Sequence, residues 1–214
     1  MPFAVRSLCA AAALLMYLGA SPAAAMTSND SAAYARVMRS INPHLAQYES
    51  RLYASTLLAV SRRAKVDPKL VMAVVTVESH WNPRARSIHG AEGLGQLKPG
   101  TARDLHVDPW SGMSNLRGVA TYLHRLFALF HAAPQPLRAT IAGYNAGPNA
   151  VGRHGQIPHN GQTPRYVEKV LLALGMVRSR LGIDVPAAEL PAAENALAAI
   201  DRADAAFWGV RSAR

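Results

Sequence analysis

The chain has 214 residues and a formal net charge of +10 at pH 7, from 23 Lys and Arg against 13 Asp and Glu. This length fits one ordinary domain with extensions. A chain this basic is attracted to polyanions. Because the N-terminal residues indicate export, acidic cell-wall polymers or anionic lipid surfaces are better candidates than nucleic acid. The single cysteine, Cys9, excludes a fold held by internal disulfides.

Residues 1–25 have the pattern of a secretory signal peptide. Arg6 precedes an apolar stretch that runs to Leu18, and small residues end the segment at Ala25. We expect cleavage after Ala25, since the apolar stretch is too short for a comfortable membrane span; an uncleaved N-terminal anchor is the alternative. Cleavage would also remove Cys9, and export without disulfides fits a bacterial periplasm. The predicted location is therefore the periplasm, with no stable membrane span after cleavage.

Helical periodicity and capping residues predict a mainly α protein with no convincing strands. The expected helices span residues 28–41, 45–64, 68–81, 100–105, 114–131, 136–146 and 163–181. Two irregular tracts rich in glycine, 82–100 and 149–162, interrupt them. Structured loops of this length are usually functional.

Composition divides the rest of the chain into three parts. Residues 26–44 are an N-terminal segment with a weak helix, and residues 45–184 are the helical domain. Residues 185–214 are an Ala- and Pro-rich tail with a possible helix from Ala192 to Phe207. The tail is the part in which we would look for a partner-binding segment.

One carboxylate, Glu78, stands out by its setting. It ends the run that begins at Leu70, and apolar side chains cover most of the circumference of that helix, so the helix should be buried. Poor solvation and the negative end of the helix dipole both favour the protonated acid and raise its pKa. A general acid near neutral pH needs this condition; the alternative is a solvated glutamate where the helix leaves the core.

No other acid between Glu78 and Gly182 has a hydrophobic setting like that of Glu78. Glu92 lies among loop glycines and should be exposed, Asp104 and Asp108 look like surface or capping residues, and Glu168 faces polar neighbours. A standard glycosidase uses two flanking carboxylates. If the chain cleaves glycans, the sequence therefore favours a design with one carboxylate.

Other catalytic chemistries find little support in the sequence. Ser79 and Ser87 lack a Ser-His-Asp context. Four histidines lie in or near the irregular tracts without the spacing of a zinc protease, namely His80, His89, His154 and His159. We expect no metal and no cofactor.

Several ordered motifs resemble the catalytic domain of the soluble lytic transglycosylase (SLT) family. The resemblance runs from about Leu52 to Leu181, with the motifs in the family's order and with fitting spacing. They are Glu78-Ser79, the tract Ser87 to Ala102 with Gly93-Leu94-Gly95-Gln96, Asn115-Leu116 with Gly118 and Tyr122-Leu123, Ala142-Gly143-Tyr144-Asn145-Ala146-Gly147-Pro148, and Thr163 with Tyr166-Val167.

The resemblance implies a lysozyme-like helical domain with a substrate groove and little or no sheet. It also implies cleavage of the bond from N-acetylmuramic acid to N-acetylglucosamine in peptidoglycan. A single glutamate at the Glu78 position would protonate the glycosidic oxygen and then accept the proton of the muramic C6 hydroxyl, leaving a 1,6-anhydro end.

The same resemblance suggests six substrate-binding residues. Ser87 could hydrogen-bond the acid or the N-acetyl group, Gln96 a sugar amide or hydroxyl, and Tyr144 could stack on a sugar. The other three candidates are Asn145, Gln162 and Tyr166. Gln162 stands where the family commonly has glutamate, and Glu92 and Gly95 stand where methionine is commoner.

Two other functions remain open at the level of the sequence. A hydrolase on the same fold would let water attack, but it needs a water-activating residue that the sequence does not reveal. A wall-binding accessory component of a secretion, conjugation or pilus machine would use the tail and the basic charge. Both would bind peptidoglycan strands.

Overall fold

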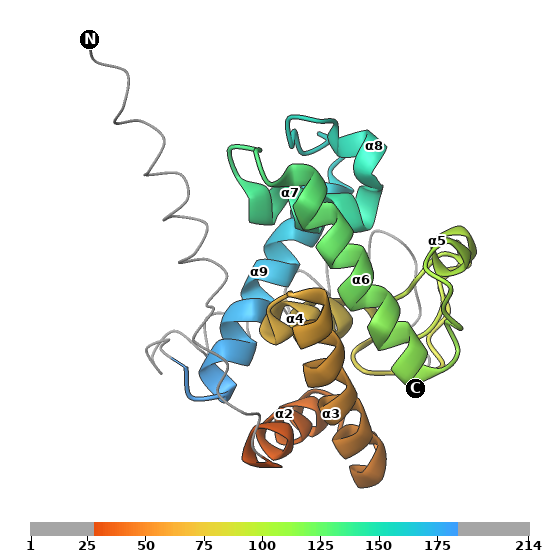
Figure 1. The fold of residues 1–214 in the computed structure, drawn as a ribbon, viewed down its shortest axis with the longest axis vertical. Helices are drawn as coiled ribbons and strands as arrows, with labels where there is room; N and C mark the ends of the chain where they lie inside the picture. The colour runs from red at the N-terminus through yellow and green to blue at the C-terminus, as the bar shows by residue number, and fades with distance from the viewer. Residues whose placement is uncertain (1–27, 184–214) are drawn as a thin grey trace.

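The computed structural model describes residues 28–183, and within that range the chain is helical and has no β-strand (Figure 1). The helices are α2 (Ser28–Ile41), α3 (Gln47–Ala64), α4 (Pro68–Ser79), α5 (Pro99–Asp104), α6 (Gly112–Phe130), α7 (Pro136–Ala146), α8 (Pro148–Val151) and α9 (Gln162–Arg180). The predicted signal peptide at 1–25 and the predicted tail at 185–214 lie outside the described residues.

The mainly α class and most helix positions predicted from the sequence are confirmed. The start of α4 has the expected cause, because the Asp67 side chain accepts a hydrogen bond from the Lys69 backbone N–H at 2.9 Å and Pro68 takes the first helical position. The predicted end of this helix at Trp81 is two residues too late. The helix stops at Ser79 because His80 adopts a left-handed conformation with φ of 48°.

Helix α4 is the buried centre of the fold. It lies among α9, α6 and α3 and contacts all three (Figure 1). Every residue from Leu70 to Thr76 is buried, as the all-round apolar pattern predicts. Burying such a helix on all sides removes a large apolar area from water, and it carries the Glu78 end of the helix into the middle of the domain.

The tract between α4 and α5 is an ordered loop. Glu92 forms isolated antiparallel bridges with Arg86 on one side and with Leu97 on the other. The expectation that Glu92 is exposed is wrong, because only 13% of its side chain is accessible and its carboxylate lies 3.9 Å from the Arg86 guanidinium.

The second irregular tract is more ordered than expected. Residues Pro148–Val151 form the short helix α8, and α9 begins at Gln162, one residue before the predicted cap. Proline at the first position of α8 and Gly152 with φ of 67° after its end account for its length. Among residues 28–183, no helix combines the length and the hydropathy needed to cross a membrane.

Candidate functional site

The carboxyl group of Glu78 lies at the C-terminal end of α4, between buried helix and solvent. Its side chain is only partly exposed. Burial raises the pKa of this carboxyl from 4.5 to about 7, because a low-dielectric setting disfavours the charged form. At neutral pH the group is therefore close to half protonated, so both its acid and its base forms are available.

The chain turns sharply directly after Glu78. His80 and Trp81 are consecutive non-glycine residues with positive φ, 48° and 63°, a conformation that costs free energy for such side chains. The Trp81 ring is fully buried, and its Nε1–H donates to the Thr76 hydroxyl at 3.2 Å. Burial of the indole offsets the strained turn and fixes the last turn of α4, in which Glu78 lies.

Tyr166 of α9 is the direct partner of Glu78. Its hydroxyl donates a hydrogen bond to Glu78 Oε1 at 2.6 Å. This bond and the positive charge of Lys169, one turn further along α9, each act to lower the Glu78 pKa against the larger effect of burial. Burial and the nearby Glu78 raise the pKa of the Tyr166 hydroxyl well above its ordinary value, so Tyr166 stays a hydrogen-bond donor.

Ser87 and Gln96 lie in the loop that follows α4, and both bond the loop itself. The Ser87 hydroxyl accepts from the Ala91 backbone N–H at 3.0 Å. Gln96, with φ of 47°, donates from Nε2 to the carbonyl oxygens of Ala85 and Gly93, each at 3.0 Å. The Gln96 amide hydrogens are thus used within the loop, and its Oε1 remains as an acceptor for a ligand.

Asn115 of α6 forms hydrogen bonds to the backbone of the same loop. This fully buried side chain accepts from the Gly95 N–H at 2.8 Å and donates to the carbonyls of Glu92 and Pro109 at 3.1 and 2.8 Å. A β-carbon at Gly95 would stand 2.1 Å from a Val119 methyl group. The loop therefore packs directly onto α6, and only glycine fits at this contact.

The residues of the α7 motif tie the site together from the other side. The Tyr144 hydroxyl donates to the Gly95 carbonyl at 2.8 Å, and its buried ring lies 5.3 Å from that of Tyr122. Asn145 Oδ1 accepts from the Thr163 hydroxyl at 3.1 Å, which joins α7 to α9. With 9% exposure, Tyr144 has little ring surface free for stacking on a sugar.

Gln162, the first residue of α9, is exposed beside this network. Asn160 forms two hydrogen bonds with the first turn of α9. Its side chain accepts from the Thr163 N–H at 2.8 Å and donates to the Thr163 hydroxyl at 3.1 Å. None of these hydrogen bonds among residues 28–183 involves Gln162. A neutral amide at this place adds no second negative charge near Glu78.

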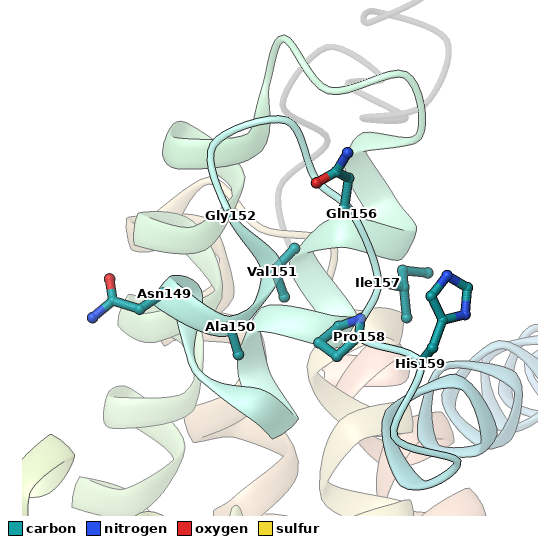
Figure 2. A pocket seen from close by; sticks show the side chains of 8 residues that line it. All are labelled: Asn149, Ala150, Val151, Gly152, Gln156, Ile157, Pro158 and His159. Carbon is teal, nitrogen blue, oxygen red and sulfur yellow. The ribbon is translucent and has the colours of Figure 1, made fainter.

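A hollow of about 460 Å³ lies between α8 and the segment that leads to α9. Figure 2 shows Asn149 and His159 at opposite ends of it, with Val151 and Pro158 between them. Its amide and imidazole groups could bind hydroxyl or peptide groups of a ligand. In residues 28–183 no group of three His, Cys, Asp or Glu side chains is arranged to hold a metal ion.

The structure brings some of the predicted residues into direct contact and leaves others apart. Glu78 and Tyr166 are bonded to each other, whereas Ser87, Gln96, Tyr144 and Asn145 bond surrounding backbone or helices. Sequence reasoning missed the positioning roles of Asn115, Asn160, Trp81 and Lys169. Asn115 was visible only as part of a motif, since its three bonds join segments that lie 6 to 23 residues away.

Comparisons with known proteins identify the family of the chain. The sequence model of the family described as "Transglycosylase SLT domain" matches residues 55–166, slightly more than half of the chain. The chain is 39% identical over 88 residues to membrane-bound lytic murein transglycosylase F of Serratia proteamaculans, and 31% identical over 135 residues to the transglycosylase of Enterobacteria phage PRD1. These matches cover 39% and 62% of this chain but only 18% and 47% of the relatives.

Two solved structures have a similar fold. The 70 kDa soluble lytic transglycosylase of Escherichia coli superposes with a TM-score of 0.54 at 23% identity, over 74% of this chain and 32% of that one. An inactive mutant of the lytic transglycosylase Slt from Pseudomonas aeruginosa gives 0.52 at 22% identity, over 76% and 32%. The lysozyme-like helical fold predicted from the sequence is confirmed by these likenesses.

Proposed function

Because the chain belongs to the transglycosylase SLT domain family, we propose that it cleaves the β-1,4 bond from N-acetylmuramic acid to N-acetylglucosamine in peptidoglycan and leaves a 1,6-anhydro muramic end. Glu78 is the acid and then the base of this reaction. The substrate class is the one named by its murein-cleaving relatives. We place the reaction in the bacterial envelope, where that polymer lies.

The observation that carries the proposal is the Glu78 carboxyl with its pKa raised to about 7. In the first step its proton passes to the glycosidic oxygen, the bond from C1 to that oxygen breaks, and the N-acetylglucosamine hydroxyl leaves. In the second step the muramic C6 oxygen bonds to C1, and its proton returns to the Glu78 carboxylate. The acid is regenerated, and no water is consumed.

A single carboxylate suffices for this sequence of proton transfers. The groups in residues 28–183 that act on the Glu78 pKa are Tyr166 and Lys169, and no second carboxylate is among them. Glu92 is engaged near Arg86, and Gln162 is neutral. A hydrolase would need a further group to activate water, so the intramolecular hydroxyl fits this site better.

The surrounding residues take positioning and binding roles. Tyr166 orients the carboxyl through its 2.6 Å hydrogen bond. Gln96 Oε1 and Ser87 border the loop beside the acid and would bond the acetamido and hydroxyl groups of the sugars. Tyr144 and Asn145 act mainly by holding the loop and α9 in register, since their polar atoms already have partners.

The test is a mass spectrum of the muropeptides released from purified peptidoglycan by the chain beginning at Met26, alongside Glu78→Gln. We expect anhydro-muramic ends from the unmodified chain and at least a thousandfold less release from the variant, because the proton donor and acceptor are lost. Retained binding of the variant to peptidoglycan is the control for folding.

Two outcomes would contradict the proposal. Reducing muramic ends would mean that water attacks and that the chain is a hydrolase. Binding of peptidoglycan without any release by the unmodified chain would favour the wall-binding accessory component instead.

A further inference from the structure

A groove between α2 and α3 gathers three arginines around one hollow. Arg36 and Arg39 project from α2 and Arg51 from α3, and the hollow between the helices measures about 230 Å³. Ala32 and Ala35 are the small residues of its α2 side. These alanines leave the space that the guanidinium groups border. We call this feature the arginine groove.

The arginine groove has no counter-ion within the described part of the chain. None of Arg36, Arg39 and Arg51 pairs with a described acid, and no acid is among the residues lining the hollow. The acids of the two helices, Asp30 and Glu49, do not line the hollow, and each acts on a tyrosine hydroxyl, that of Tyr34 and that of Tyr53. Three like charges held together repel one another, so an anion bound among them would relieve that repulsion.

Guanidinium groups fit phosphate particularly well. Each offers a planar fork of donors that can bond two oxygens of one phosphate at once. Two arginines one helical turn apart and a third on the facing helix can therefore surround one phosphate group or bridge two neighbouring ones. The chemistry of the groove thus selects a phosphate-bearing anion.

Apolar side chains near the arginine groove indicate that the phosphate belongs to a lipid surface and not to a dissolved anion. Tyr48 is 72% and Leu52 41% exposed. On α3, Tyr48 lies three residues before Arg51 and four residues before Leu52, so the Tyr48 side chain neighbours both. A dissolved anion needs no apolar contact. A lipid surface offers phosphate and hydrocarbon together, and tyrosine and leucine beside arginine are typical of side chains that enter such an interface.

The groove is distant from the catalytic acid. Figure 1 shows α2 and α3 at one end of the molecule and α7 and α8 at the other. Arg180, at the end of α9, donates to the Ser40 hydroxyl at 2.7 Å, next to Arg39. Tyr166, the partner of Glu78, lies 14 residues earlier on α9, or about 21 Å along the helix axis. The protein could rest on a surface through the groove while the Glu78 site stays accessible.

We propose that the arginine groove binds the phosphate groups of an anionic phospholipid surface, with Tyr48 and Leu52 entering the interfacial layer. The attachment is peripheral and reversible. It would hold the Glu78 site at a set height from the lipid, and it is independent of the reaction proposed for that site.

The test is sedimentation of the chain beginning at Met26 with vesicles of phosphatidylcholine alone, and with vesicles in which one lipid in four is phosphatidylglycerol. We expect binding to the anionic vesicles only. Arg36→Gln/Arg39→Gln/Arg51→Gln should lower the partition coefficient about a hundredfold, from the electrostatic contribution of three basic residues near an anionic surface. Circular dichroism checks that the exposed substitutions leave the fold intact.

A matched variant separates the groove from net charge. Arg103→Gln/Arg125→Gln/Arg153→Gln removes the same charge from exposed positions elsewhere, and it should lower binding by less than about threefold at physiological salt. Equal losses in the two triple variants, or no preference of the unmodified chain for anionic vesicles, would overturn the proposal.

Two further measurements separate a lipid surface from a dissolved phosphate. Tyr48→Ser/Leu52→Ser keeps the charge and should weaken vesicle binding about tenfold through lost apolar contact. Inorganic phosphate at the concentration of the accessible lipid phosphate should not displace the protein. An unchanged partition of the serine variant, or full displacement by inorganic phosphate, would overturn the assignment to lipid.

Discussion

At the Glu78 carboxyl, two opposed influences set the acidity of one group. Burial at the end of α4 favours the neutral acid, while the Tyr166 hydroxyl and the Lys169 charge favour the carboxylate. The balance lies at a pKa of about 7, where proton donation and acceptance are both accessible. A site with a single carboxylate needs this balance more than a two-carboxylate site does, because the same group must change form within each turnover.

Tyr166→Phe should shift the pH dependence of glycan cleavage. Removing the hydroxyl takes away a hydrogen bond that favours the charged form, so the Glu78 pKa rises above about 7. The alkaline limb of the kcat/KM profile, where the proton donor is lost, should then move to higher pH by about one unit, and kcat at neutral pH should fall about tenfold or more because the carboxyl is less well oriented. The measurement is muropeptide release from pH 5 to 9.

The position of the alkaline limb distinguishes a change in the Glu78 pKa from a loss of packing around Tyr166. Lys169→Met removes a charge that also lowers the Glu78 pKa, so it should move the limb in the same direction without removing the direct hydrogen bond. A fall in kcat with the limb unmoved in both variants would show that Tyr166 and Lys169 do not act on the acidity of Glu78.

Among the elements, the loop between α4 and α5 has a conformation that is fixed by contacts with neighbouring helices. It has no helix or strand, yet Asn115 of α6 and Tyr144 of α7 bond its backbone at Gly95 from two directions. Gly95 itself admits no larger side chain beside Val119. The loop is therefore held in one conformation by helices that are distant in sequence, which is the preorganisation that a binding loop needs.

Asn115→Ala should destabilise the domain by about 2 to 4 kcal/mol, because it removes the partners of the Gly95 N–H and the Pro109 carbonyl. The Glu92 carbonyl would keep its hydrogen bond from the Leu97 N–H. Urea unfolding followed by circular dichroism measures the loss. Residual folded enzyme should also be less active, since the loop beside Glu78 is released.

A buried position with no such bonds is the control. The Thr140 hydroxyl is buried and has no hydrogen-bond partner among the described residues, so Thr140→Val should leave the free energy of unfolding within about 1 kcal/mol of its original value. A similar loss in both variants would mean that Asn115 contributes through packing rather than through its three hydrogen bonds.

The difference between helices and loops also explains how much of the protein could be predicted. Helix starts such as Asp67-Pro68 are determined by neighbouring residues, so they could be predicted from the sequence. The left-handed turn at His80 and the burial of Glu92 depend on contacts across the fold, so they were missed. The ordered motifs identified the family, and the apolar helix made Glu78 the predicted acid. The bond from Tyr166 to Glu78 joins residues 88 positions apart and required the structure.

Over the whole molecule, the acid at the end of the central helix α4 has a stability cost that depends on pH. Glu78 binds its proton more tightly in the folded chain, with a pKa of about 7, than in the unfolded chain, where the ordinary value is 4.5. As pH rises from about 4.5 to about 7 the unfolded state ionises first, so the free energy of unfolding falls, and above pH 7 the loss is complete.

The neutral isostere Glu78→Gln should escape this cost. We expect the variant to be more stable than the unmodified protein by about 1 to 3 kcal/mol at pH 8, and the difference between the two should shrink to its low-pH baseline below about pH 4. Denaturant unfolding of both proteins at pH 4, 6 and 8 measures it. A stability difference that does not change with pH would mean that Glu78 has an ordinary acidity, and the fold would then have given up no stability to hold a general acid at the end of α4.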